Sequence, residues 1–234
     1  MRELFDRTRD FRQDTFRNIV SLRESQDLFD DLTDGDPLLS RLAAAAEMRV
    51  KEHIPPGIVN RGFHYSLAIG YPFETEPFMA SRYGDGTFGV WYGSLDLETT
   101  IFETGHHMLT AELGIEGLRE VVIRERAVYL VYAEAILLDL VGREKNFPQL
   151  VADDYSFTQA IGKRVSREGH PGLLAPSARC KGVNIVVFNP AILRDPCPHC
   201  YLTYHLDPAA RTVTVERQRG ETLLVVPEWQ AKYD

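Results

Sequence analysis

The sequence predicts a mixed α+β fold with a helical section added at its N-terminus. Two observations predict this fold class. The first fifty residues carry apolar side chains at roughly helical spacing among charges. From Val59 onward the chain contains short runs rich in Val, Ile, Tyr and Phe, which are bounded by Gly and Pro and separated by helical stretches. With no internal repeat or linker, we expect a helical section over residues 1–57 that packs on a main domain over residues 58–234.

The N-terminal section is expected to contain two helices. The segment "DGDPLLSRLAAAAEMRVK" starts the second, with Asp36 as N-cap and Pro37 at the first helical position. "HIPPG" at residues 53–57 ends it, because proline cannot continue a helix. The residues that suggest the first helix are Phe11, Phe16, Ile19, Val20, Leu28, Phe29 and Leu32.

The main domain is expected to alternate strands with two helices. Helices are predicted at about 96–111 and 153–168, and a hairpin that turns through Asp207 to Ala210 is predicted near the end of the chain. The predicted strands are "FHYSLAIGY" (63–71), "FGVWYGS" (88–94), "LREVVIRERAVYLVYAEAILLDL" (118–140) and "GVNIVVF" (182–188).

Charge and hydropathy narrow the function classes. The net charge of −8 argues against a broad basic face for nucleic acid or an anionic membrane. No apolar run approaches the length of a membrane span, and the charged start does not resemble a signal peptide. Three cysteines do not form a typical disulfide framework. We therefore expect a cytoplasmic protein with no direct nucleic-acid or membrane partner.

The stretch "FGVWYGSLDLETTIFETGHH" (88–107) predicts a strand, a turn at Gly93 and a helix. On that helix Glu103 lies two turns past the strand end, near Tyr92. Two interpretations are open from spacing alone: a solvated carboxylate paired with His107, or a carboxylate that belongs to a site. Spacing alone favours the solvated flank, because helix-flank charges are usually hydrated.

Two patterns raise the question of a metal. Glu103 and His106 have the Glu-x-x-His spacing of di-iron bundles, but the second copy that such sites need is absent. Cys197 and Cys200 form half of a zinc site, and a turn before the last hairpin is the other interpretation. We predict no metal. The residues that could complete a zinc site are Cys180, His199 and His205.

Three arginines lie at the edges of predicted strands, in segments that contain Gly, Ser or Tyr. They are Arg61, Arg82 and Arg179. Guanidinium groups are favoured where a phosphate is held in two-point contact, although each of the three could also be a surface arginine. The sequence has neither a dinucleotide-binding glycine motif nor a Walker loop, and Ser177 lacks the glycines of a nucleophile elbow.

The order of these segments is more informative than any one of them. An arginine before "FHY", then "SRYGDG", "VWYGSLDLETTIFET", "LLDL", "DDYSFTQAIGKRV", "GLLAPSAR" and "GVNIVVFNP" resembles the RES domain over about residues 58–193. That family supplies the toxins of bacterial RES–Xre toxin–antitoxin pairs. The resemblance implies a fold related to ADP-ribosyltransferases, with a twisted, largely antiparallel sheet at its core.

The resemblance also implies a site. It assigns catalytic roles to Arg61, Glu103 and Ser177, and NAD-binding roles to Arg82, Tyr92, Tyr65 and Arg179. Many family members have a tyrosine directly after the early arginine. Here His64 stands before Tyr65, so the early position can be matched to Arg61 or to His64.

The family is known for consuming NAD by phosphorolysis or hydrolysis of the nicotinamide–ribose bond. This chemistry suits the matched residues, because a carboxylate such as Glu103 can stabilise an oxocarbenium-like ribose. The resemblance implies NAD as substrate, inorganic phosphate as a co-substrate, no cofactor, an Xre-type antitoxin partner and a homo-oligomer. Two alternatives stay open: ADP-ribose transfer to a protein, and a catalytically degenerate module that binds NAD or a partner.

Overall fold

The computed structural model describes residues 2–21, 66–74 and 78–228. The described chain forms a mixed α/β fold around an eight-stranded sheet with the strand order β1-β2-β5-β4-β3-β6-β7-β8. The strands are β1 (Thr8–Val20), β2 (Trp91–Ser94), β3 (Val122–Asp139), β4 (Gly172–Pro176), β5 (Val183–Val187), β6 (Leu193–Asp207), β7 (Thr212–Gln218) and β8 (Glu221–Pro227). Short helical turns are η1 (Arg2–Phe5), η3 (Pro148–Leu150) and η4 (Pro190–Ile192).

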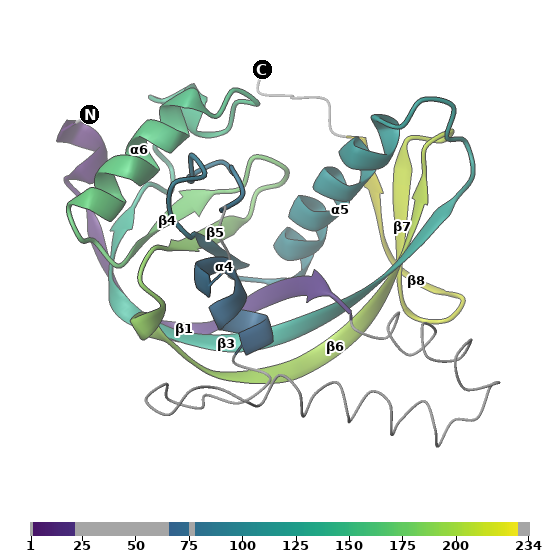
Figure 1. The fold of residues 1–234 in the computed structure, drawn as a ribbon, viewed down its shortest axis with the longest axis horizontal. Helices are drawn as coiled ribbons and strands as arrows, with labels where there is room; N and C mark the ends of the chain where they lie inside the picture. The colour runs from purple at the N-terminus through teal and green to yellow at the C-terminus, as the bar shows by residue number, and fades with distance from the viewer. Residues whose placement is uncertain (1, 22–65, 75–77, 229–234) are drawn as a thin grey trace.

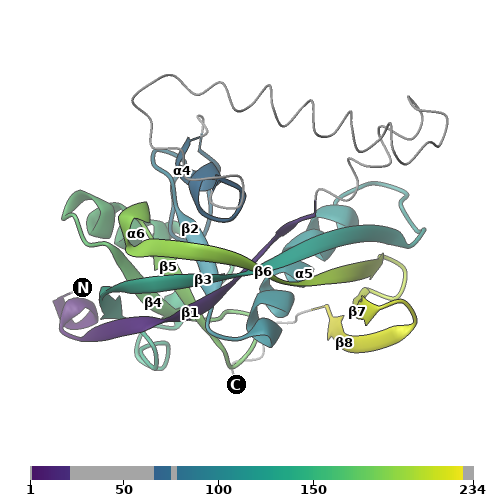
Figure 2. The same ribbon diagram turned by 90° about the horizontal axis from the view of Figure 1, so that it is seen from below.

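The sheet is largely antiparallel, as expected. Among its pairings, β3 with β4 is parallel and the others are antiparallel. β1 pairs with β3 on one side and, through Phe16 opposite Ser94, with β2 on the other. The pairings therefore link β1, β2, β5, β4 and β3 into a ring, and the long strands cross over one another with a marked twist in Figure 2.

The expected helix over the first part of the N-terminal section is wrong for residues 8–20, which form β1. Phe11 lies in a core cluster with Trp91 and Val131, whereas Phe16 packs against a different cluster, on the opposite face of the strand. A strand that changes its buried face along its length spaces its apolar residues as a helix does. The second expected helix, over residues 36–52, lies outside the described residues.

Most elements of the main domain match the prediction. The strands expected at 88–94, 118–140 and 182–188 are present as β2, β3 and β5, and β6 and β7 form the expected hairpin. The strand expected over 63–71 is wrong where it is described, because Ser66–Gly70 is a π-helix (η2) and Tyr71–Glu74 is α4. Strands β4 and β8 were not predicted.

Two helices, α5 (Leu97–Leu113) and α6 (Ser156–Arg167), confirm the predicted pair. Figure 1 shows them over opposite ends of the long strands β3 and β6. Asp96 caps α5, since its carboxylate accepts hydrogen bonds from the Thr99 amide at 2.7 Å and the Thr99 hydroxyl at 2.8 Å. Neither described helix is long and apolar enough to cross a membrane, and the same holds for the other described helical segments.

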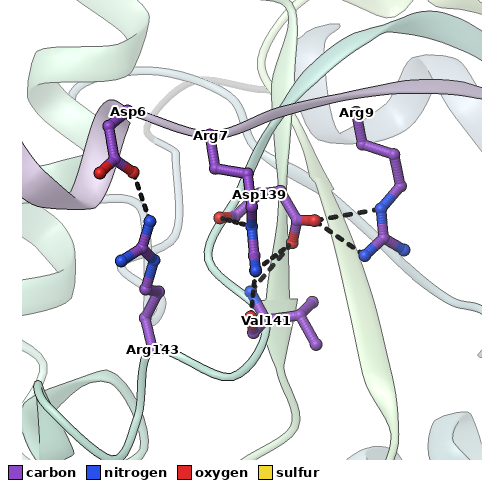
Figure 3. Close-up of polar contacts among 6 residues, drawn as sticks. All are labelled: Asp6, Arg7, Arg9, Asp139, Val141 and Arg143. Carbon is purple, nitrogen blue, oxygen red and sulfur yellow. Dashed lines mark hydrogen bonds and ion pairs between the residues drawn. The ribbon is translucent and has the colours of Figure 1, made fainter.

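Asp139 ties β1 to the end of β3 (Figure 3). Its carboxylate is 2% exposed and accepts hydrogen bonds from Arg7 Nη2 at 3.1 Å, Arg9 Nε at 3.0 Å and the Val141 amide at 3.0 Å. Arg143 also contacts Asp6, just before β1. The start of β1 is therefore held by charge-assisted hydrogen bonds in addition to the strand pairing.

We expect Asp139→Asn to lower the free energy of unfolding by about 2 kcal/mol. The neutral amide would turn its NH2 group toward one of the two arginines, so a donor would face a donor. Urea denaturation followed by circular dichroism measures the change. As a control, Asp10→Asn changes a carboxylate whose side chain is 62% exposed and whose partner is Arg12, so its effect should stay within about 0.5 kcal/mol. Equal effects of the two substitutions would contradict this account.

Candidate functional site

A cavity of about 520 Å³ lies between β1, β2, the start of α5, β5 and the segment 78–90. This volume is within the usual range for small-molecule sites. The polar side chains in its walls on which the argument depends are Arg17, Arg82, Tyr92, Glu103, Tyr155 and Asn184. The structure thus brings together three of the residues that the sequence assigned to a site: Arg82, Tyr92 and Glu103.

Glu103 is held by two hydrogen bonds on one of its oxygens. Oε1 accepts from Ser177 Oγ at 2.6 Å and from Asn184 Nδ2 at 2.7 Å. Both hydrogen bonds to the described residues fall on Oε1, which leaves Oε2 for a ligand. Glu103 is half-buried and hydrogen-bonded to two side chains of other elements, which favours the interpretation as a site carboxylate over that of a solvated flank.

Ser177 donates a hydrogen bond to Glu103 from outside the cavity wall. It is fully buried in the turn between β4 and β5, and its Oγ accepts from the amides of Arg179 at 3.0 Å and Cys180 at 3.2 Å. Because these donors occupy its lone pairs, its own proton is directed to Glu103. Ser177 is not part of the cavity wall, so the structure supports a positioning role rather than contact with a substrate.

Asn184 is a site residue that the sequence analysis missed. Its Oδ1 accepts from Ser94 Oγ at 2.7 Å, which orients its amide NH2 group toward Glu103. The available signal was a single amide side chain within the apolar run "GVNIVVF". A polar residue in a buried strand needs a partner, and here that partner is the carboxylate of Glu103.

Tyr92 lines the cavity with a fixed hydroxyl. The Tyr92 oxygen accepts from the Tyr83 amide at 2.8 Å and lies 2.8 Å from Ser81 Oγ. Burial raises the pKa of Tyr92 to about 12, so the phenol stays protonated at neutral pH. These bonds anchor the segment 81–83, which carries Arg82, to β2.

Arg82 is held in place by backbone and aromatic contacts. Its Nη1 donates to the carbonyl of Ala152 at 2.6 Å and, more weakly, to that of Leu150 at 3.3 Å. Its Cζ lies 4.6 Å from the centroid of the Tyr155 ring, which also lines the cavity. The guanidinium is therefore oriented while several of its N–H donors remain for an anion.

Arg179 does not lie in the cavity wall, contrary to the expected substrate contact. Its side chain is 3% exposed, and Nη2 forms an ion pair of 2.8 Å with Asp153. Burial in the turn after β4 explains this position, because the turn directs the Ser177 hydroxyl to Glu103 and the arginine to Asp153. The predicted residues Arg61 and Tyr65, with His64, lie outside the described residues.

The histidine and cysteines of the two possible metal motifs do not gather into a metal site among the described residues. His106 is half-buried on α5, and burial lowers its pKa to about 4, so it is neutral at pH 7. Cys197 is exposed and Cys200 is buried on β6. Within residues 2–21, 66–74 and 78–228, no group of three or more His, Cys, Asp or Glu side chains could hold a metal ion.

The described residues form an α/β fold with a cavity whose wall contains an anchored carboxylate. The RES domain family matches residues 54–207, and the chain belongs to this family. The match confirms the resemblance that the sequence motifs carried. No curated protein matches the chain.

Comparison with solved structures finds a chain that is similar to this one over most of its length. It is described as the crystal structure of the M. tuberculosis MbcT–MbcA toxin–antitoxin complex. Its chain is 12% identical to this one, with a TM-score of 0.43, and the alignment covers 86% of this chain and 88% of that chain.

Proposed function

We propose that the protein is a toxin of a toxin–antitoxin pair that cleaves the nicotinamide–ribose bond of NAD. Membership of the RES family supports the general class. The observation that carries the specific reaction is Glu103, whose Oε1 is anchored by Ser177 and Asn184 in the wall of a cavity of about 520 Å³. A carboxylate fixed in this way can face a developing positive charge without reorganising.

The leaving group of this reaction makes few demands on the protein. Nicotinamide is a cationic pyridinium in NAD and departs as a neutral molecule, so no general acid is needed. Positive charge develops on the ribose, as in glycoside cleavage, and Glu103 would stabilise it. Tyr92 would offer an aromatic face to the nicotinamide ring, and Arg82 would bind the diphosphate. Water or phosphate then attacks the ribose carbon that nicotinamide leaves.

The partners follow from the same proposal. An Xre-type antitoxin would neutralise the toxin by covering the cavity, and the toxin would assemble as a homo-oligomer. NAD would be the substrate rather than a resident cofactor, with inorganic phosphate as the co-substrate if the reaction is phosphorolysis. Co-purification of the toxin with an antitoxin, followed by light scattering of the complex, measures both the binding and the oligomeric state.

The direct test is incubation of the purified, antitoxin-free protein with NAD at several phosphate concentrations. We expect release of nicotinamide, measured by liquid chromatography, together with ADP-ribose or its 1″-phosphate. A rate that rises with phosphate indicates phosphorolysis, and a phosphate-independent rate indicates hydrolysis. Intact NAD at all phosphate concentrations would contradict the proposal. In a parallel incubation of cell extract with NAD labelled in its ADP-ribose part, label recovered on protein would instead favour ADP-ribose transfer to a protein target.

Ser177→Ala should lower kcat by about tenfold and leave the KM for NAD nearly unchanged. The loss of the hydroxyl removes one of the two bonds that orient Glu103, so the effect arises in the transition state. The exposed Ser156 at the start of α6 provides a control, and Ser156→Ala should have no effect on the rate.

A double substitution distinguishes positioning from direct participation. If Ser177 acts only through Glu103, adding Ser177→Ala to Glu103→Gln should cause no further loss of rate. A further tenfold loss in that background would show that Ser177 contributes on its own, and the positioning role would be abandoned.

A further inference from the structure

Two arginines, one half-buried and one buried, lie on the β1 side of the cavity. Arg17 on β1 is part of the cavity wall together with Asn18. Arg126 on β3 is 8% exposed and donates to Asn18 twice, to Oδ1 at 2.9 Å and to the carbonyl at 2.8 Å. Neither arginine forms an ion pair with a carboxylate of residues 2–21, 66–74 or 78–228. Their charges are therefore not balanced within the described part of the protein.

The contacts of Arg17 leave several of its donors unused. Nη1 donates to the Tyr92 carbonyl at 2.8 Å, and Cζ lies 5.4 Å from the centroid of the Trp91 ring. Nε is buried and has no hydrogen-bond partner. A guanidinium carries five N–H donors, so most of those on Arg17 remain for a ligand.

Withdrawing the positive charge of Arg17 from water is electrostatically unfavourable. Burial and, to a smaller extent, the positive charge of Arg126 together lower the pKa of Arg17 to about 10. A charge withdrawn from water without a partner is costly, whereas a half-buried cation in a cavity wall is already partly desolvated and oriented for an anion. An anionic ligand would supply the negative charge that balances Arg17.

We propose that Arg17 binds a phosphate group inside the cavity, from the β1 side of its wall. This inference rests on the proposed function, because NAD and the co-substrate both bring phosphate chemistry to the cavity. The phosphate group could be part of the NAD diphosphate, or it could be the inorganic phosphate that attacks the ribose. Guanidinium suits both, since it can contact two phosphate oxygens at once.

The test compares Arg17→Gln and Arg17→Lys with Arg12→Gln in the full chain. Arg12 lies on the same strand with its side chain 62% exposed, so its substitution controls for loss of one positive charge on β1. Calorimetry at low ionic strength measures the Kd of inorganic phosphate and, separately, of ADP-ribose. We expect Arg17→Gln to weaken at least one of the two ligands by about tenfold or more and Arg12→Gln to change neither. Arg17→Lys, which keeps the charge and loses the two-point contact, should fall between the wild type and Arg17→Gln.

The two ligands distinguish the two sources of phosphate. Weaker binding of ADP-ribose with unchanged binding of inorganic phosphate assigns Arg17 to the NAD diphosphate. The reverse result assigns it to the attacking phosphate. In the second case the nicotinamide release rate of Arg17→Gln should also lose its dependence on phosphate concentration.

A purely structural role for Arg17 gives a different result. Arg17 would then only hold β2 to β1 through Tyr92 and Trp91, so Arg17→Gln would lower the melting temperature and leave both Kd values unchanged in the folded protein. That outcome would overturn the proposal, as would a wild-type protein that binds neither ligand. If Arg17→Gln does not fold, Arg17→Lys decides by the same measurements. Ligand binding that depends on Arg17 in a protein that leaves NAD intact would refute the proposed reaction and keep this site.

Discussion

Glu103→Gln is expected to lower the rate of nicotinamide release by about two to three orders of magnitude, with no loss of folded protein. Glutamine has the shape of glutamate, and its carbonyl oxygen can still accept hydrogen bonds from Ser177 and Asn184. In place of Oε2 the glutamine carries a neutral NH2 group, which cannot stabilise a positively charged ribose. The substitution therefore removes the charge and keeps the packing.

The matched control for this substitution is Glu98→Gln. Glu98 lies in the first turn of the same helix and is exposed, so loss of its charge should change the rate by less than about twofold. Binding of ADP-ribose should be retained in both variants, because the proposed diphosphate contacts involve arginines and not Glu103. Wild-type rates in folded Glu103→Gln would show that the carboxylate takes no part in the reaction.

Local patterns predicted the elements that carry their own capping residue or a composition typical of one conformation. The helix at 97–113 was predictable because Asp96 supplies an N-cap before an amphipathic run, and β3 was predictable from its dense β-branched and aromatic residues. β1 was not, since Phe11 and Phe16 pack on opposite faces and thereby imitate helical spacing. Only the pairing of β1 with the distant strand β3 determines its conformation, and local spacing does not contain that information.

The site was predictable to a different extent. Arg82, Tyr92 and Glu103 could be assigned through the family motifs, and they do share one cavity. Arg17 was missed because its segment was expected to be part of a helical section that lies outside the family motifs. The burial of Arg179 depends on a turn geometry that the string "APSAR" does not specify, so its position outside the cavity wall could not be predicted from the sequence.

Gly162 controls how closely α6 approaches the segment that carries Arg82. A Cβ at Gly162 would lie 1.8 Å from the carbonyl oxygen of Tyr83 and 2.7 Å from its carbonyl carbon. Both atoms belong to the backbone, so no side-chain rotation can relieve the contact. The same segment is fastened to β2 by the Tyr92 hydroxyl and to α6 by Gln159, which donates to the Ser81 carbonyl at 3.0 Å. Only glycine at position 162 therefore lets α6 pack this closely against the segment 81–83 of the cavity wall.

Gly162→Ala is accordingly expected to lower the free energy of unfolding by about 3 kcal/mol and the melting temperature by roughly 6–12 °C. The rate of nicotinamide release should also be lower than in the wild type at temperatures where the variant is folded. The reason is that α6 must move away from the segment that carries Arg82. Gly105→Ala provides the control, since Gly105 lies inside α5 and its Cβ would stand 3.5 Å from the nearest atom, an ordinary contact with Val226. Without a clash, the higher helix propensity of alanine should leave that variant as stable as the wild type or up to about 1 kcal/mol more stable. Calorimetric scanning of both variants measures the difference, and a Gly162→Ala protein as stable as Gly105→Ala would show that α6 and the Tyr83 segment can separate at little cost.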